Sequence, residues 1–236
     1  GKFLSTGTGN TFVGSEAGLG VDGSEITGDN NTCVGTLSGT ALITIATGNT
    51  LVGHNSGPAI TTGEYNTALG RNTLLAAQDD NGINGGLFIG YKAGTNLAPH
   101  ANCSASGVGA VYIGMEAGLN LGDNTDGTFN KENTLIGFRA LGGGDTTPTA
   151  GNTAYANTAV GFSALKGPTS GGSVANLTGY YNTAVGDRAL YVNESGHHNV
   201  AINHGALNDN TSGHYNIAIG SLALEDNTVG SNNIAI

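Results

Sequence analysis

The sequence of 236 residues has little charge, few cations and no long apolar run. Charged residues make up 10% of it, and seven lysines and arginines leave a formal net charge of −10. So few cations, spread along the chain, cannot follow a phosphate backbone, which disfavours nucleic acid as a partner. No run of 18 apolar residues, basic amphipathic helix or signal peptide is present, so we expect no membrane contact within this segment.

Cysteine and catalytic motifs are also scarce. The two cysteines, Cys33 and Cys103, belong to units several repeats apart, which disfavours a disulfide between them. The sequence has no G-x-S-x-G elbow, no H-E-x-x-H pair and no P-loop. The adjacent carboxylates Asp79–Asp80 and Glu225–Asp226 are more typical of solvated loops than of a glycosidase pair. We therefore expect neither enzymatic activity nor a cofactor.

Glycine is abundant, with 42 residues, and a short motif recurs from end to end. The stretch GYYNTAVGDRAL at Gly179–Leu190 contains one copy: an asparagine, three small, β-branched or apolar residues, and a glycine. Two degenerate copies, GLFIG and AVYIG, begin at Gly86 and Ala110. The other copies begin at Asn10, Asn31, Asn49, Asn66, Asn133, Asn157, Asn182, Asn199, Asn216 and Asn233. This repetition predicts a single elongated repeat array over residues 1–236, which we interpret as a piece of a longer fibre protein.

The residues that follow the asparagine predict a short strand. With the asparagine as position zero, position one is threonine or aliphatic, position three is always aliphatic, and position two ranges from alanine to tyrosine. The apolar spacing of two excludes a helix, and positions one and three share a face while position two points the other way. Both faces are apolar, so we expect the strand to lie between two layers. We expect position one to face inward and position two to face a partner chain, with the closest approach over Ala159–Ala235.

The rest of the unit predicts a corner and a second extended segment. Position four is glycine in every complete copy except Asn203, and asparagine is the replacement that best tolerates a left-handed backbone. Position seven is always small, and position eight is either glycine or leucine. The shortest repeat is 17 residues, and longer ones add loops before the next asparagine, at Thr95–Gly109, Gly142–Ala156 and Lys166–Tyr181. Strands stacked in register would rise about 4.8 Å per coil, giving a rod roughly 55 Å long with these loops on one edge.

Three copies of the motif carry a resemblance to a known family. GYYNTAVGDRAL, GHYNIAIGSLAL at Gly213–Leu224 and NKENTLIGFRAL at Asn130–Leu141 resemble the head repeats of YadA-like trimeric autotransporter adhesins. They also resemble related repeats of phage tail fibres and bacterial surface fibres. The resemblance implies an all-β, left-handed parallel β-roll, or β-solenoid, of about twelve coils that assembles as a homotrimer. The 17-residue coil is longer than the repeat of the adhesin heads, which favours the fibre branch as much as the autotransporter branch.

Aromatic and imidazole side chains gather just before several of the strands. We expect them to stack on one edge of the array, either as a platform for sugar rings or as packing between turns. These candidate receptor-binding or glycan-binding residues are Tyr65, Tyr155, Tyr180, Tyr181, His197, His198, His214 and Tyr215.

Metal binding has little support in the sequence. His197 and His198 would point to opposite faces in an extended chain, which disfavours shared metal ligation. The acidic stretch at Asp123–Gly127 does not fit the EF-hand spacing, although loosely bound calcium there is left open.

These features predict a structural and adhesive segment of a trimeric extracellular fibre, on a cell surface or a virion. It would attach through its edge to a cell-surface glycan or protein receptor, and three copies would give avidity. The alternatives are a monomeric β-solenoid that binds sugar or ice, and a glycan-degrading tail spike. Ice binding by the threonines of position one is disfavoured because Val200, Ile217 and Ile234 replace them in the later copies, which suggests that this column faces inward.

Overall fold

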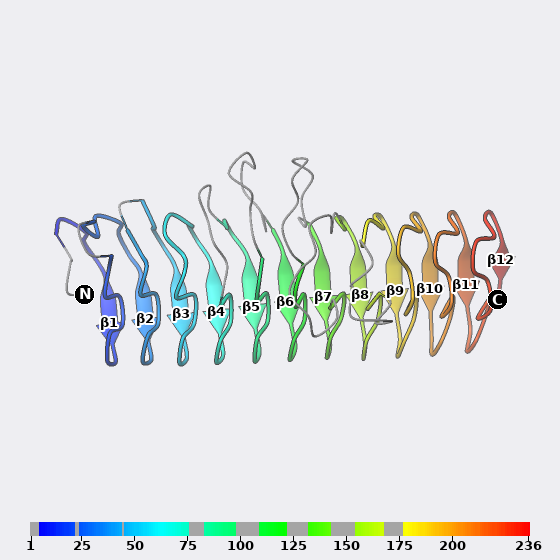
Figure 1. The fold of residues 1–236 in the computed structure, drawn as a ribbon, viewed down its shortest axis with the longest axis horizontal. Helices are drawn as coiled ribbons and strands as arrows, with labels where there is room; N and C mark the ends of the chain where they lie inside the picture. Colours follow the sequence, from blue (N-terminus) through cyan, green and yellow to red (C-terminus); the bar gives the residue numbers. More distant parts are fainter. Residues whose placement is uncertain are drawn as a thin grey trace.

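The computed structural model describes residues 5–21, 24–43, 45–75, 83–97, 109–121, 132–142, 154–167 and 177–236. These ranges are all-β and contain no helix, so they contain none able to cross a membrane. Twelve parallel strands form one sheet in chain order, with the two termini at opposite ends of the row (Figure 1). The strands are β1 (Thr11–Val13), β2 (Thr32–Val34), β3 (Thr50–Val52), β4 (Thr67–Leu69), β5 (Leu87–Ile89), β6 (Val111–Ile113), β7 (Thr134–Ile136), β8 (Thr158–Val160), β9 (Thr183–Val185), β10 (Val200–Ile202), β11 (Ile217–Ile219) and β12 (Ile234–Ala235).

Every predicted strand is present, and each pairs with the next in register. The middle residues Ala184, Ala201 and Ala218, for example, are direct partners across β9, β10 and β11. The strands wind into a β-solenoid of about nine turns, fewer than the twelve coils predicted. Several connections between strands run through residues outside the described ranges, which include most of the predicted edge loops and all of Asp79–Asp80 and Asp123–Gly127.

The prediction of which face points inward was wrong. Position two is fully buried from Cys33 in β2 to Ala218 in β11, so it lines the interior of the coil. Positions one and three are partly exposed and face outward; Val13 and Ile219, for instance, are 55% and 37% exposed. Position two has too little volume in its alanine copies to reach a partner, whereas the aliphatic side chains of positions one and three form a continuous outer layer.

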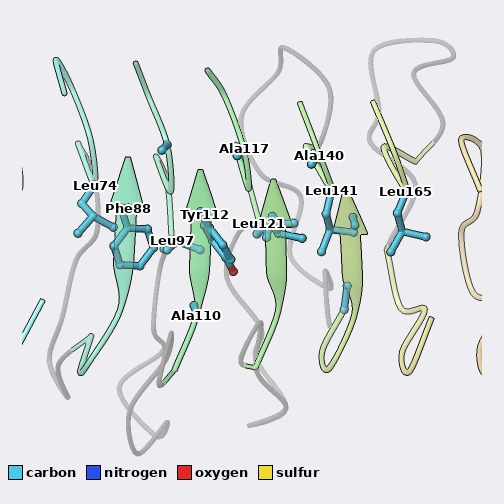
Figure 2. Close-up of a cluster of buried hydrophobic side chains, with 14 of the residues drawn as sticks. Leu74, Phe88, Leu97, Ala110, Tyr112, Ala117, Leu121, Ala140, Leu141 and Leu165 are labelled. Carbon is cyan, nitrogen blue, oxygen red and sulfur yellow. The ribbon is translucent and has the colours of Figure 1, made fainter. Parts of the chain in front are cut away.

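The interior is filled by side chains whose sizes compensate within each unit. Where position two is aromatic, position eight is glycine: a Cβ on Gly118 would lie 2.5 Å from the Tyr112 ring, and one on Gly94 would lie 2.6 Å from the Phe88 ring. The β7 unit departs from this pairing, because Leu135 and Leu141 are both large and both buried. In most units with alanine at position two, as in β8 to β11, position eight is leucine, and Leu165 is buried (Figure 2). Position eight is therefore glycine or leucine because the interior of the coil must be filled to a similar density in each unit.

A buried ladder of asparagine side chains joins successive units at position zero. The Asn199 amide nitrogen Nδ2 donates to Oδ1 of Asn182, at 3.2 Å, and to the Gly213 carbonyl of its own coil, at 2.9 Å. Its Oδ1 accepts from the backbone N–H of Asn216 at 3.0 Å. Each asparagine thus satisfies backbone groups and closes its own coil, and it is fully or nearly fully buried from Asn31 to Asn216.

The predicted corner at position four is confirmed, and its cause is close contact between coils. The glycines there have φ near +135°, and a Cβ on Gly186 would lie 2.5 Å from the backbone oxygen of Asn203 in the next coil. Asn203 itself has φ of 98°, in the left-handed half of the map, as predicted. The second extended segment predicted after the corner is instead a tight turn with left-handed residues at positions six and eight.

Candidate binding surfaces

The outer face of the sheet is a long surface that lacks charge. Positions one and three of the twelve units contain only threonine, valine, leucine and isoleucine. In the last units both positions become aliphatic, as in Ile217 and Ile219 of β11, which are 36% and 37% exposed. A parallel sheet with two apolar faces is normally covered on both sides, and here the described residues cover only the inner one. The outer face therefore has the composition of a protein interface.

Seven of the eight predicted ring residues do come together, in two adjacent columns on one corner. The column at two residues before the asparagine contains Tyr155, Tyr180, His197 and His214, with ring centroids 5.0, 4.7 and 4.9 Å apart and nearly parallel planes. We name this the inner column.

The outer column contains the residues immediately before the asparagine, Tyr181, His198 and Tyr215. Their centroids are 5.1 and 4.9 Å apart. Rings of the two columns meet edge to face, so the whole set packs in a herringbone arrangement.

Stacking determines what these rings can offer a ligand. In the inner column the rings stack face to face, so the faces between them are closed to a ligand, whereas Tyr181 and His198 of the outer column are tilted by 49°. Tyr181 and Tyr215 are about half exposed, and both adopt a left-handed backbone with φ of 53° and 56°. Tyr65 stands apart, because Gly48 and Gly85 occupy the equivalent position in the neighbouring units, and its ring is 64% exposed. The geometry thus supports packing between turns for the seven rings and leaves Tyr65 as an isolated exposed aromatic.

The histidine pair is arranged differently from the sequence-based prediction. His198 is left-handed, with φ of 57°, so its ring turns back and its Nδ1 lies 3.0 Å from Nδ1 of His197. The prediction of opposite faces assumed an extended backbone and was wrong. Burial lowers the pKa of His197 below its ordinary value, and the neighbouring His214 and His198 lower it further. Burial likewise raises the pKa of Tyr155, helped by Tyr181 and Tyr180.

Other candidate chemistry is weak in the described part of the chain. No group of three histidine, cysteine or acidic side chains gathers there in a way that suits a metal ion. Cys33 is buried inside the coil, which raises the pKa of its thiol to about 12, and Cys103 lies outside the described ranges. Glu225 is half-buried and Asp226 exposed at a turn, which fits the expected solvated loop.

Comparison with known proteins adds no relative to this picture. No protein-family model matches the chain, and neither a curated protein nor a solved structure matches it. The fold and its surfaces therefore carry the functional argument by themselves.

Proposed function

We propose that this chain is a segment of a homotrimeric extracellular fibre, a rigid shaft whose outer corners attach to a cell-surface receptor or glycan. The observation that carries the proposal is the outer face of the sheet, with its two uncharged columns at positions one and three. A second copy of the same face is the natural cover, because the columns repeat at the spacing of the strands and match themselves in register.

We propose three copies rather than two because of the resemblance of the repeats. A rod with one apolar face can close around an axis parallel to its length, leaving every copy equivalent. The repeats GYYNTAVGDRAL and GHYNIAIGSLAL resemble those of trimeric adhesin heads, whose coils wind left-handed. We therefore propose both that the coils wind left-handed and that three chains assemble.

Charge introduced into the outer face tests the assembly. Replacing Ile202→Glu and Ile219→Glu together would put six carboxylates into the centre of a trimer, so we expect the assembly to dissociate in sedimentation velocity. Val229→Glu is the matched control, because Val229 is 66% exposed but lies in a turn away from the sheet. If the double variant sediments like the control and the wild type, the outer face is not the contact between copies.

Ice binding is a second candidate, because the outward direction of position one removes the argument against it. Thr11, Thr32, Thr50 and Thr67 form a regular outward column in β1 to β4, beside aliphatic residues at position three. The column changes to valine and isoleucine from β10 onward, which fits a protein contact better than an ordered water layer. Thermal hysteresis, measured on the wild type and on Thr50→Leu, tests this candidate. If the chain binds ice, the wild type shows thermal hysteresis and Thr50→Leu loses it.

A further inference from the structure

A stripe of large apolar side chains lies on the corner that follows the sheet, away from both the outer face and the ring columns. Position five, the first residue after the corner glycine, carries Tyr91, Met115, Phe138 and Phe162 in four successive units. The same position is polar or charged in every other complete unit. Those residues are Ser15, Thr36, His54, Arg71, Asp187, His204 and Ser221.

The stripe is exposed and is held in place by bonds between coils. Met115 and Phe162 are 47% and 49% exposed, and the rings of Phe138 and Phe162 stack with centroids 5.1 Å apart. The backbone N–H of Arg139 donates to the Met115 carbonyl, and that of Arg188 to the Phe162 carbonyl. The apolar residues thus form a fixed ridge along the rod, of a kind that marks an interaction surface.

Cations border this ridge at regular intervals. Position six carries Lys92, Arg139 and Arg188 in the units of β5, β7 and β9, so the charges are two coils apart, roughly 9.6 Å. Arg71, at position five of the β4 unit, adds a fourth cation. Four of the seven lysines and arginines of a chain with net charge −10 therefore lie along one corner. We name these cations and the ridge the corner strip.

Two of the four cations contact aromatic rings of the ridge. The Lys92 ammonium lies 5.4 Å from the centroid of the Tyr91 ring, and the Arg139 guanidinium lies 5.3 Å from that of Phe138. Arg139 also pairs with Glu116 at 2.6 Å, while Arg188 is exposed and lies 5.6 Å from the Tyr191 ring. Asp187, at position five of the β9 unit, directly precedes Arg188 in the sequence.

We propose that the corner strip binds an acidic polysaccharide. The apolar ridge would contact the nonpolar faces of the sugars, while the cations pair with carboxylate, sulfate or phosphate groups. The regular interval between cations favours a polymer that repeats its charge over a small molecule with one charge. Nucleic acid fits poorly, because four cations spread over the six units of β4 to β9 are too few to follow its phosphates. The inference rests on the attachment part of the proposed function and does not depend on the number of copies.

Binding of defined polymers tests the proposal. Hyaluronan and polygalacturonate fragments serve as acidic probes and dextran of matched length as the neutral one, with affinities measured by isothermal titration. We expect the acidic probes to bind at least tenfold more tightly than dextran, and their affinity to fall with added salt. The Lys92→Gln/Arg188→Gln variant should lose about tenfold or more, and Phe162→Ser should also weaken binding. Val229→Ser, at an exposed apolar residue outside the corner strip and the ring columns, should leave the affinity unchanged.

Other results would overturn the inference. Absence of binding, equal binding of dextran, equal binding of single-stranded DNA, or an equal loss in Val229→Ser would each contradict a site at the corner strip. Light-scattering mass measured on the same samples separates this failure from that of the fibre assembly. A trimer that does not bind overturns only the polysaccharide site, whereas a monomer that binds overturns only the assembly.

Discussion

Loss of one rung of the asparagine ladder should destabilise the fold well beyond the average substitution. Asn199 is fully buried, and Asn199→Ala removes the acceptor of the Asn216 backbone N–H, which is itself buried. It also removes the donor to Asn182 Oδ1, the acceptor of Asn216 Nδ2, and one of the two donors to the Gly213 carbonyl, the other being Asn210 Nδ2. One orphaned N–H costs about 1–3 kcal/mol and each of the three further lost bonds about 0.5–1.5 kcal/mol, so we expect about 2.5–7.5 kcal/mol in total.

Urea unfolding followed by circular dichroism measures this loss, at one protein concentration because assembly contributes to stability. Asn208→Ala is the control, since the Asn208 side chain is half-buried and bonds only to Asp209 in the adjacent position. It should change the free energy of unfolding by less than about 0.5 kcal/mol. If Asn199→Ala matches this control, the ladder does not hold the coils together and the reasoning fails.

Three further results follow from the interior, the corner and the ring columns. Ala184→Phe should destabilise the fold by about 1–3 kcal/mol, because the larger side chain overpacks the coil interior. Adding Leu190→Gly should restore much of the lost stability. A melting temperature that stays low in the double variant would contradict the size compensation between positions two and eight. Gly186→Ala should lower the melting temperature more than Gly85→Ala, because both glycines have positive φ but only the first Cβ would meet the next coil; equal losses would contradict the close contact at the corner. Because the pKa of His197 is lowered in the folded protein, the unfolded chain binds a proton at this residue more readily than the folded one. The contribution of His197 to stability is therefore fully present above about pH 6.5 and is lost as the pH falls below that value. His197→Tyr should flatten this acid-side decline in melting temperature, and an unchanged profile would contradict the assignment.

The sequence was sufficient to predict the twelve strands, their register and the corner glycines, because the motif repeats with a period that only stacked strands satisfy. It was not sufficient to predict which face is internal. Leu51 and Val52 are equally apolar, and the decision depends on the volume left by position eight. That signal was available, since glycine at position eight accompanies Phe12, Phe88 and Tyr112, but it appears only when both columns are compared within each unit.

The candidate site was likewise predicted only in part. Stacking of the rings from Tyr155 to Tyr215 was predictable from their recurrence before each strand. The convergence of His197 and His198 was missed, although a signal was available: the column of His198 contains Gly48 and Gly85 in other units, which indicates a left-handed backbone. The stripe at position five was missed because its members differ in chemistry, and only their alignment across four coils reveals them.

The central claim is that the outer face of the sheet is covered by two further copies of the chain. The molar mass of the wild-type protein in solution, determined by light scattering across a range of concentrations, tests it most directly. The account predicts three times the 23.4 kDa of one chain. A stable 23.4 kDa particle at every concentration would contradict it, because the aliphatic column of position three and the aliphatic residues of position one would then face water.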